Sequence, residues 1–200
     1  SVLMTHMACG DDPDDPMNEM QINKFEKAFD LVERKTKRSI CNSACLMNFP
    51  HLSFDWVRSG IAAYGGESKN LNLKTAMTFR APIISIRKIR KGERVGYGGR
   101  KKASKDMRIA IVYAGYADGI PQTTIDGTKV LVNDKQAVIF GRVSMDLVSI
   151  DVTNLPQVSE NDLVSFWCEE LPINEFSNNN GLISYELMTR ISNRVKVKVI

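Results

Sequence analysis

The pattern of apolar residues changes at about Leu73, and this change restricts the possible folds more than any other feature of the chain. Before it, a short apolar segment at residues 2–7 precedes a segment with helical spacing, which is typical of alternating strands and helices. After it, several short segments alternate apolar and polar residues with a period of two, which is typical of β-strands. The sequence therefore predicts an α/β domain over residues 1–72 and a mainly β domain over residues 73–200.

The first part has the rhythm of a parallel sheet with its helices. Asn18 and Gln21 form a capping-box-like pair, which predicts a helix start, and Phe25 and Val32 belong to its apolar face. Basic residues over 34–38 favour a helix end there, because cations stabilise a helix C-terminus. A βα rhythm also places functional side chains at the carboxyl ends of the strands.

The second part contains most of the predicted strands. They cover residues 82–90, 108–114, 129–132, 136–140 and 147–153, and Asn133-Asp134 favours a tight turn between the third and the fourth. Val148, Ile150 and Val152 alternate with polar residues, which predicts one buried face. Near the end we expect a loop at residues 178–180, a short helix carrying Leu187, and a last strand over residues 195–199.

Composition excludes several classes of protein. The chain has 27 Lys and Arg against 23 Asp and Glu, a net charge of only +4. Tyr97 is the one aromatic residue within the basic stretch of residues 87–108, so we expect a solvated face there and no nucleic-acid partner. No apolar run approaches the roughly 18 residues of a membrane helix, and no signal-peptide pattern is present. We therefore expect no membrane partner and a cytoplasmic location.

Cysteine usage indicates neither a disulfide framework nor a metal centre. The chain has four cysteines, and Cys41 and Cys45 lack the spacing of a zinc site. We expect free thiols, as in a reducing compartment, and no metal ion.

Four groups of residues could carry chemistry. The first is His6 at the end of a predicted strand, and the second is Asn42-Ser43, where donors could hold a phosphate. The third is Arg58 with the turn at Gly60. The fourth comprises three glycine-rich segments at residues 95–98, 115–119 and 141–146. A structural histidine, a solvated turn, a surface arginine and packing corners are the alternative readings of the four groups.

The motifs as a set resemble the C-terminal half of bacterial alanine racemases, which are fold-type III pyridoxal-phosphate enzymes. The resemblance covers essentially the whole chain. It is carried by Phe54-Asp55-Trp56-Val57-Arg58-Ser59-Gly60-Ile61, Val95-Gly96-Tyr97-Gly98-Gly99, Gly115-Tyr116-Ala117-Asp118-Gly119, Gly141-Arg142-Val143-Ser144-Met145-Asp146, Ile183-Ser184-Tyr185-Glu186-Leu187 and Asn193-Arg194-Val195. The resemblance implies the C-terminal part of a (β/α)8 barrel to residue 72, followed by a β-barrel-like domain.

The resemblance also implies roles for individual residues around pyridoxal 5'-phosphate. Ser43 and the backbone of Gly60 and Ile61 correspond to phosphate-holding positions, Arg58 to the arginine facing the pyridine nitrogen, and His6 to a histidine beside the ring. Because Arg58 keeps its positive charge, it would leave that nitrogen without a proton and weaken the electron sink.

A second set of implied roles concerns the substrate. Tyr97 corresponds to the catalytic tyrosine, the Met145 amide to a group that binds the substrate carboxylate, and Tyr116 to a tyrosine lining the entrance. In the family the tyrosine of one subunit completes the site of the other, which implies a homodimer. The implied reaction interconverts L- and D-alanine and supplies D-alanine for peptidoglycan.

The chain departs from the family pattern in two respects. The cofactor lysine, which is the other base, lies in the N-terminal half, as does an arginine that helps to bind the substrate, and neither is present here. We therefore expect this stretch alone to be inactive. Many members also carry a histidine and a tyrosine where this chain has Ser39 and Asn193, positions that support the cofactor arginine and contact the phosphate.

Two further functions remain open from the sequence, besides a basic nucleic-acid-binding module. One is a racemase of another small amino acid, such as serine, because part of the pocket belongs to the missing half. The other is a non-catalytic remnant or a β-domain kept for protein interaction.

Overall fold

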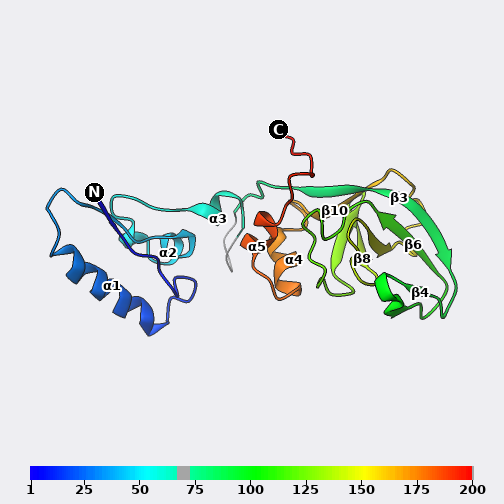
Figure 1. Cartoon of the computed structure of the whole chain (residues 1–200), viewed down its shortest axis with the longest axis horizontal. Helices are drawn as coiled ribbons and strands as arrows, with labels where there is room; N and C mark the ends of the chain where they lie inside the picture. The colour runs from blue at the N-terminus through cyan, green and yellow to red at the C-terminus, as the bar shows by residue number, and fades with distance from the viewer. Residues whose placement is uncertain (67–72, 200) are drawn as a thin grey trace. The chain divides into compact units, whose positions relative to one another are not determined.

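The computed structural model describes residues 1–66 and 73–199 and divides the chain into two compact units (Figure 1). Unit 1 covers Ser1–Lys74 and unit 2 covers Thr75–Ile200. The domain boundary expected at residue 72 lies outside the described residues.

Unit 1 is built on parallel strands, as its sequence rhythm predicts. Strand β1 (Val2–Met4) pairs in parallel with β2 (Lys37–Ser39), and helix α1 (Pro16–Phe29) lies between them in the sequence. A parallel bridge between Asn42 and Arg58 adds a third extended segment. Parallel neighbours require a crossover connection, which α1 provides. The carboxyl ends of the three segments therefore lie at one edge.

Helix α1 starts earlier than the sequence predicts. Its N-cap is Asp15, whose carboxylate accepts a hydrogen bond from the Met17 amide at 2.8 Å, and Pro16 occupies the first helical position. Both residues are favoured there, so the predicted start at Asn18 is wrong. The Asn18 side chain is buried and donates to the Asp12 carbonyl at 2.7 Å instead.

The predicted end of this helix is also wrong. Helix α1 ends at Phe29, so Val32 and the basic stretch over residues 34–38 lie beyond it, and Lys37 is the first residue of β2. Three short helices complete unit 1: α2 (Ser43–Asn48), the 3-10 helix η1 (Pro50–Leu52) and α3 (Gly60–Ala63). They and α1 enclose a small core of Met7, Phe25, Ile40, Cys41, Cys45 and Leu52.

Unit 2 is a closed antiparallel β-barrel. Its strands follow the order β10, β3, β6, β9, β8, β7 around the barrel. Their bounds are Leu163–Trp167 for β10, Phe79–Ile89 for β3, Met107–Val112 for β6, Val148–Asp151 for β9, Lys135–Ile139 for β8 and Lys129–Val132 for β7. Five of these were predicted from the sequence, and β10 was not. Closure removes exposed sheet edges and encloses one core.

Local sequence explains the tightest turn of the barrel. Asn133 and Asp134 connect β7 to β8 with φ angles of +48° and +60°. Such angles suit a two-residue hairpin turn, and Asn and Asp tolerate them better than other side chains do. The predicted hairpin is confirmed.

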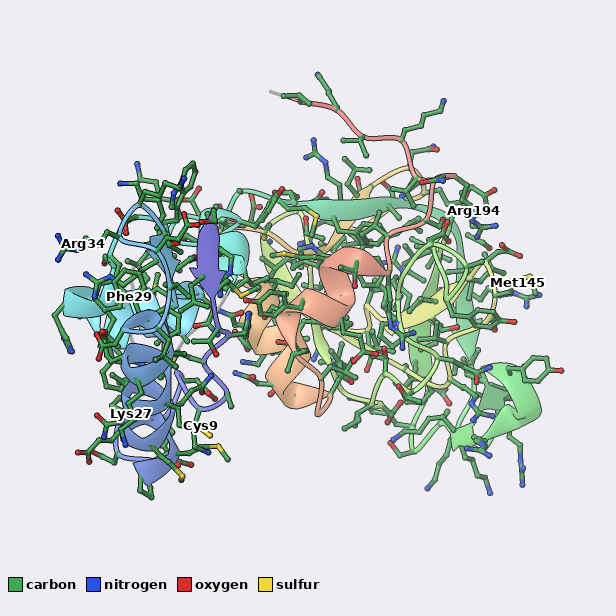
Figure 2. The ribbon with its side chains drawn as sticks, turned by 60° about the vertical axis from the view of Figure 1, so that its left-hand side comes forward. Cys9, Lys27, Phe29, Arg34, Met145 and Arg194 are labelled. Carbon is green, nitrogen blue, oxygen red and sulfur yellow. The ribbon has the colours of Figure 1, made fainter. Side chains whose placement is uncertain are left out.

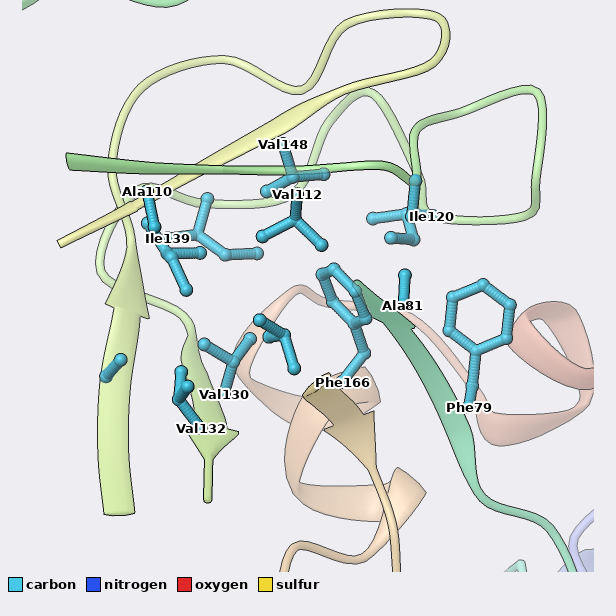
Figure 3. Close-up of a cluster of buried hydrophobic side chains, with 14 of the residues drawn as sticks. Phe79, Ala81, Ala110, Val112, Ile120, Val130, Val132, Ile139, Val148 and Phe166 are labelled. Atoms are coloured by element: carbon cyan, nitrogen blue, oxygen red, sulfur yellow. The ribbon is translucent and has the colours of Figure 1, made fainter. Parts of the chain in front are cut away.

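The barrel interior is filled by side chains from alternating positions (Figure 3). Val148, Ile150 and Val152 are at most 1% exposed, as their alternation predicts. At one end Trp167 stacks on Phe79 with ring centroids 4.8 Å apart and meets Phe176 edge-on at 5.6 Å. This aromatic cluster joins the barrel to α4 (Ile173–Asn179) and, through α4, to α5 (Ser184–Thr189).

The C-terminal part of the chain matches one of the three elements expected there. The short helix carrying Leu187 is confirmed as α5. The loop predicted at residues 178–180 is wrong at its start, because Asn178 and Asn179 close α4. The predicted last strand is also wrong, since residues 195–199 have no strand assignment and Val199 is 91% exposed.

The remaining strands of unit 2 form a small sheet that is separate from the barrel. Strands β4 (Arg94–Val95) and β5 (Lys101–Lys102) pair with each other, and the 3-10 helix η2 (Tyr97–Gly99) lies between them. Tyr97 is the first residue of η2 and so lies between the two strands of this sheet.

Candidate active site

In unit 1 the ends of the three parallel segments converge on Arg58. Its Nη2 donates to the Thr5 carbonyl at 2.8 Å and to the Ile40 carbonyl at 3.4 Å, and its Nη1 donates to the Ser39 hydroxyl at 2.5 Å. The guanidinium is thus fixed by the residues at the ends of β1 and β2. A half-buried arginine held in this way presents a permanent positive charge in a fixed orientation.

Ser39 supports Arg58 directly. Its hydroxyl accepts from Arg58 and donates to the Trp56 carbonyl at 3.0 Å, and the residue is only 3% exposed. The departure from the family pattern at Ser39 therefore leaves Arg58 with a side-chain partner at that position.

His6 lies at the same edge, just after β1. Its ring is exposed, and its Nε2 is 3.2 Å from the Asn42 side-chain nitrogen. The Asn42 amide is oriented by two other bonds, because its oxygen accepts from the Cys45 amide at 2.9 Å and its nitrogen donates to the Met7 carbonyl at 3.2 Å. Since an amide nitrogen only donates, the contact requires an unprotonated Nε2.

Ser43, Gly60 and Ile61 come from two short helices of the same unit. The Ser43 hydroxyl, at the start of α2, is 1% exposed and accepts from the Ala62 amide of α3 at 3.2 Å. Because a hydroxyl both accepts and donates, its proton can still serve an anion. Gly60 and Ile61 open α3, and a Cβ added at Gly60 would meet no atom within 4 Å. The Gly60 amide already donates to the Arg58 carbonyl at 3.0 Å, so the Ser43 hydroxyl, the Ile61 amide and the open space at Gly60 are the features that suit a phosphate group.

The two cysteines beside Ser43 are packed rather than reactive. Cys41 and Cys45 are fully buried, their sulfur atoms are 3.1 Å apart, and Cys41 donates to the Leu52 carbonyl at 3.2 Å. Burial raises the pKa of the Cys45 thiol to about 12 and also raises that of Cys41. Both remain neutral thiols at neutral pH, as do buried structural cysteines in general.

In unit 2 three predicted site residues line one cleft. Tyr97, Tyr116 and Met145 surround a volume of about 440 Å³, together with Gln122, Ser144, Asp146 and Leu147. Tyr97 is 69% exposed and Met145 is 53% exposed, so both side chains are accessible at the cleft. The structure thus brings together residues from three separate glycine-rich segments.

Close backbone approach explains the glycines of these segments. The Tyr116 amide donates to the Ser144 carbonyl and the Ala117 amide to the Met145 carbonyl, each at 3.0 Å. A Cβ at Gly115 would lie 2.3 Å from the Met145 carbonyl oxygen, so only glycine fits there. Gly96 has φ +82°, and its Cβ would lie 2.6 Å from the Arg142 amide nitrogen.

One ion-pair group at this cleft was not expected from the sequence. Arg194 contacts both Asp118 and Asp146, which lie close in sequence to Tyr116 and Met145. A signal was available, because both acids stand inside the quoted motifs, but their shared partner lies 48 or more positions away in the sequence.

The predicted site residues therefore form two groups, each within one unit. His6, Ser43, Arg58, Gly60 and Ile61 belong to unit 1, and Tyr97, Tyr116 and Met145 belong to unit 2. Over residues 1–66 and 73–199, no cluster of three or more His, Cys, Asp or Glu side chains could hold a metal ion. None of the helices in those same residues is long and apolar enough to cross a membrane.

Two family models match the chain. The model for the alanine racemase C-terminal domain matches residues 76–199, and the model for the alanine racemase N-terminal domain matches residues 1–68. Among curated proteins, the alanine racemase of Alteromonas mediterranea is 42% identical over 200 residues, which cover 98% of this chain and 55% of the relative.

Solved structures give the same result. The biosynthetic alanine racemase from Pseudomonas aeruginosa has a TM-score of 0.91 at 38% identity, covering 97% of this chain and 55% of that one. The alanine racemase from Bartonella henselae, solved with covalently bound pyridoxal phosphate, has a TM-score of 0.89 at 28% identity, covering 98% of this chain and 55% of that one.

These likenesses settle the fold class. The chain spans about half the length of the relatives it matches. The predicted architecture, the C-terminal part of a (β/α)8 barrel followed by a β-barrel-like domain, is confirmed. The chain belongs to the alanine racemase family.

Proposed function

We propose that this chain supplies the C-terminal half of a pyridoxal-phosphate-dependent alanine racemase that interconverts L- and D-alanine. The observation that carries the proposal is the cleft of unit 2, where Tyr97, Tyr116 and Met145 meet although they come from three separate segments. The expected domain division near residue 72 is part of the same proposal.

The residues of unit 1 suit the cofactor. The Ser43 hydroxyl and the backbone of Gly60 and Ile61 would hold its phosphate, with the Ile61 amide as a donor because the Gly60 amide already donates to the Arg58 carbonyl. Arg58 would face the pyridine nitrogen, with His6 beside the ring. When bound, pyridoxal phosphate supplies an electron sink that acidifies Cα of an amino acid. Because Arg58 is always positive, it would disfavour a proton on the pyridine nitrogen and would keep this electron sink moderate.

The residues of unit 2 would handle the substrate and its proton. The Tyr97 phenol would remove or deliver a proton at one face of Cα, and the Met145 amide would bind the carboxylate, with Tyr116 at the entrance. Racemisation needs a second acid/base group on the opposite face, and family members carry it as a lysine in the N-terminal half. We therefore expect no turnover by this stretch alone.

We also propose a homodimer with shared active sites, which the family resemblance implies. In the proposed dimer the unit 2 cleft of one subunit completes the cofactor site of its partner. D-alanine made in the cytoplasm would then feed cell-wall peptidoglycan.

The experiment uses the full-length protein with pyridoxal phosphate and follows D-alanine formation by chiral chromatography. Turnover of alanine that exceeds turnover of serine supports the proposal, and the 200-residue chain should give none. Absence of turnover in the full-length, cofactor-loaded protein, or a preference for serine, would overturn it.

Subunit sharing has its own test. Arg58→Ala and Tyr97→Phe each disable the proposed site, but a mixed dimer would combine one intact Arg58 with one intact Tyr97. Random reassociation of equal amounts should restore about a quarter of wild-type activity, because half of the dimers are mixed and each has one intact site. If both groups came from the same subunit, mixing would restore nothing.

A further inference from the structure

One guanidinium joins two of the three segments that form the unit 2 cleft, the one carrying Tyr116 and the one carrying Met145. Arg194 Nε donates to Asp118 Oδ1 at 2.7 Å, and its Nη2 donates to Asp118 Oδ2 at 2.9 Å and to Asp146 Oδ1 at 2.6 Å. The contact with Asp118 is bidentate, which fixes direction as well as distance.

Each acid is close to a residue that lines the cleft. Asp118 follows Tyr116 by two positions, and Asp146 follows Met145 directly. Asp118 also stabilises its own loop, since its Oδ2 accepts from the Gly115 amide at 2.8 Å. Arg194 therefore holds the segments that carry Tyr116 and Met145 without lining the cleft itself.

The C-terminal segment is held against the first of these loops. The Ser192 amide donates to the Asp118 carbonyl at 3.4 Å, and a Cβ at Gly119 would lie 3.0 Å from the Arg190 carbonyl oxygen. Arg194 and Met145 lie on the same side of unit 2 (Figure 2). The position of Arg194 is thus set by backbone packing as well as by its ion pairs.

The positive charge of Arg194 is what holds the two acidic side chains together. Asp118 and Asp146 share one cation, and without it the two carboxylates would repel each other across the cleft wall. The hydrogen bonds that Arg194 donates to Asp118 and Asp146 raise the pKa of its guanidinium above its already high ordinary value. The side chain is 45% exposed, so each pair alone is weak, and the effect depends on joining both loops.

We propose that Arg194 is a positioning residue that sets the distance between the Tyr116 and Met145 loops and so places the carboxylate-binding amide. Its effect on substrate binding rests on the proposed racemase function, whereas its effect on loop order does not. Arg190 offers a matched control, because it forms a comparable exposed ion pair with Glu186 but contacts neither acid of the cleft.

The first experiment measures residue-resolved amide hydrogen exchange in the 200-residue chain and needs no activity. In Arg194→Met, the Gly115, Tyr116 and Ala117 amides should exchange about fivefold faster, because the ion pairs that hold their loop are lost. In Arg194→Lys the exchange rates of these amides should lie between those of Arg194→Met and the wild type. Lysine keeps the positive charge but cannot form the bidentate contact with Asp118. Arg190→Met should leave these amides unchanged.

The reference amide is Ile139, which donates to the Thr128 carbonyl at 2.8 Å inside the barrel. If Ile139 speeds up as much as the loop amides in Arg194→Met, the variant has lost global stability and the positioning role is refuted. Equal exchange in Arg194→Met and Arg190→Met would also refute it.

The second experiment uses steady-state kinetics of the full-length protein. Arg194→Met should raise KM for alanine about threefold or more with kcat changed less than twofold, because looser placement weakens carboxylate binding. A fall in kcat alone, or no change in KM, would overturn the inference. A wild-type protein without racemase activity would instead refute the proposed function and leave the exchange experiment intact as the test of loop order.

Discussion

Gly115→Ala tests the steric account of the cleft most sharply. A Cβ there would lie 2.3 Å from the Met145 carbonyl oxygen and 2.4 Å from the Ser144 carbonyl oxygen, both backbone atoms. Neither atom can rotate away, so one loop has to move by roughly 1 Å to restore van der Waals contact. That movement also stretches the two hydrogen bonds that Tyr116 and Ala117 donate to the facing loop.

The expected cost follows from these contacts. Overpacking a closed site costs about 1–3 kcal/mol, and two weakened hydrogen bonds add about 0.5–1.5 kcal/mol each. Gly115→Ala should therefore lower the free energy of unfolding of unit 2 by about 2–6 kcal/mol. Gly181→Ala is the matched control, because Gly181 has φ +64° and open space around its Cβ position. Gly181→Ala should lower the free energy of unfolding only by the cost of placing alanine in the left-handed conformation, about 1–2 kcal/mol.

Urea unfolding followed by tryptophan fluorescence measures both variants. Trp167 is fully buried in unit 2 whereas Trp56 in unit 1 is 60% exposed, so the emission change reports mainly on unit 2. Equal losses of stability in Gly115→Ala and Gly181→Ala would refute the steric argument.

Three further predictions concern packing and charge. Ellman's reagent should label half-exposed Cys9 in the native chain, and Cys41 and Cys45 only after denaturation, because burial hides both of these thiols from the reagent; early labelling of either buried thiol would contradict this. The Arg38 amide and, to a smaller extent, the Lys37 side chain donate hydrogen bonds to the Asp55 carboxylate and hold its pKa below the usual 3.8. The ionised carboxylate therefore stabilises unit 1 above pH 3.8, and this stabilisation is lost as the pH falls through the pKa of Asp55 in the folded state. In Asp55→Asn, the helicity of unit 1 measured by circular dichroism should therefore fall less steeply as the pH is lowered. The same pH dependence in the variant and the wild type would contradict the assignment. Phe166→Ala should cost about 3–5 kcal/mol in urea unfolding because its ring is fully buried in the barrel, and a loss below about 1 kcal/mol would show that the ring is dispensable.

Local sequence was sufficient for the elements whose signals are local. Strand β7 and its turn at Asn133 and Asp134 follow from alternation and turn chemistry, and both were predicted. The start of α1 was missed because Asp15-Pro16 is a stronger start signal than the Asn18 pair. In each case the deciding residues lie within a few positions of the element.

Elements that depend on distant partners were not predicted correctly. The Val195–Val199 alternation resembles a strand, but among the described residues this segment has no neighbouring strand to pair with. Strand β10 lacks clear alternation because Phe166 and Trp167 are both fully buried. Helix α4 ends in asparagines, and packing of Phe176 on Trp167 outweighs their low helix propensity.

The candidate site shows the same division. Arg58, the turn at Gly60 and Asn42-Ser43 stand out by composition as candidates for binding an anion, whereas the roles of Tyr97, Tyr116 and Met145 came only from the family resemblance. The meeting of Tyr97 with Met145, and the shared partner Arg194, depend on how separate loops fold together. Exposed charges find partners through tertiary structure, which no short-range pattern encodes.

The most direct measurement of the central claim compares Tyr97→Phe with Tyr113→Phe in the full-length, cofactor-loaded protein. Tyr113 is a similarly exposed tyrosine of unit 2 that does not line the cleft. Tyr97→Phe should reduce alanine racemisation in both directions by about 100-fold or more, because it removes the phenol that we propose carries the proton. Tyr113→Phe should stay within about twofold of wild type. Near-normal turnover by Tyr97→Phe, or equal losses in both variants, would contradict the account.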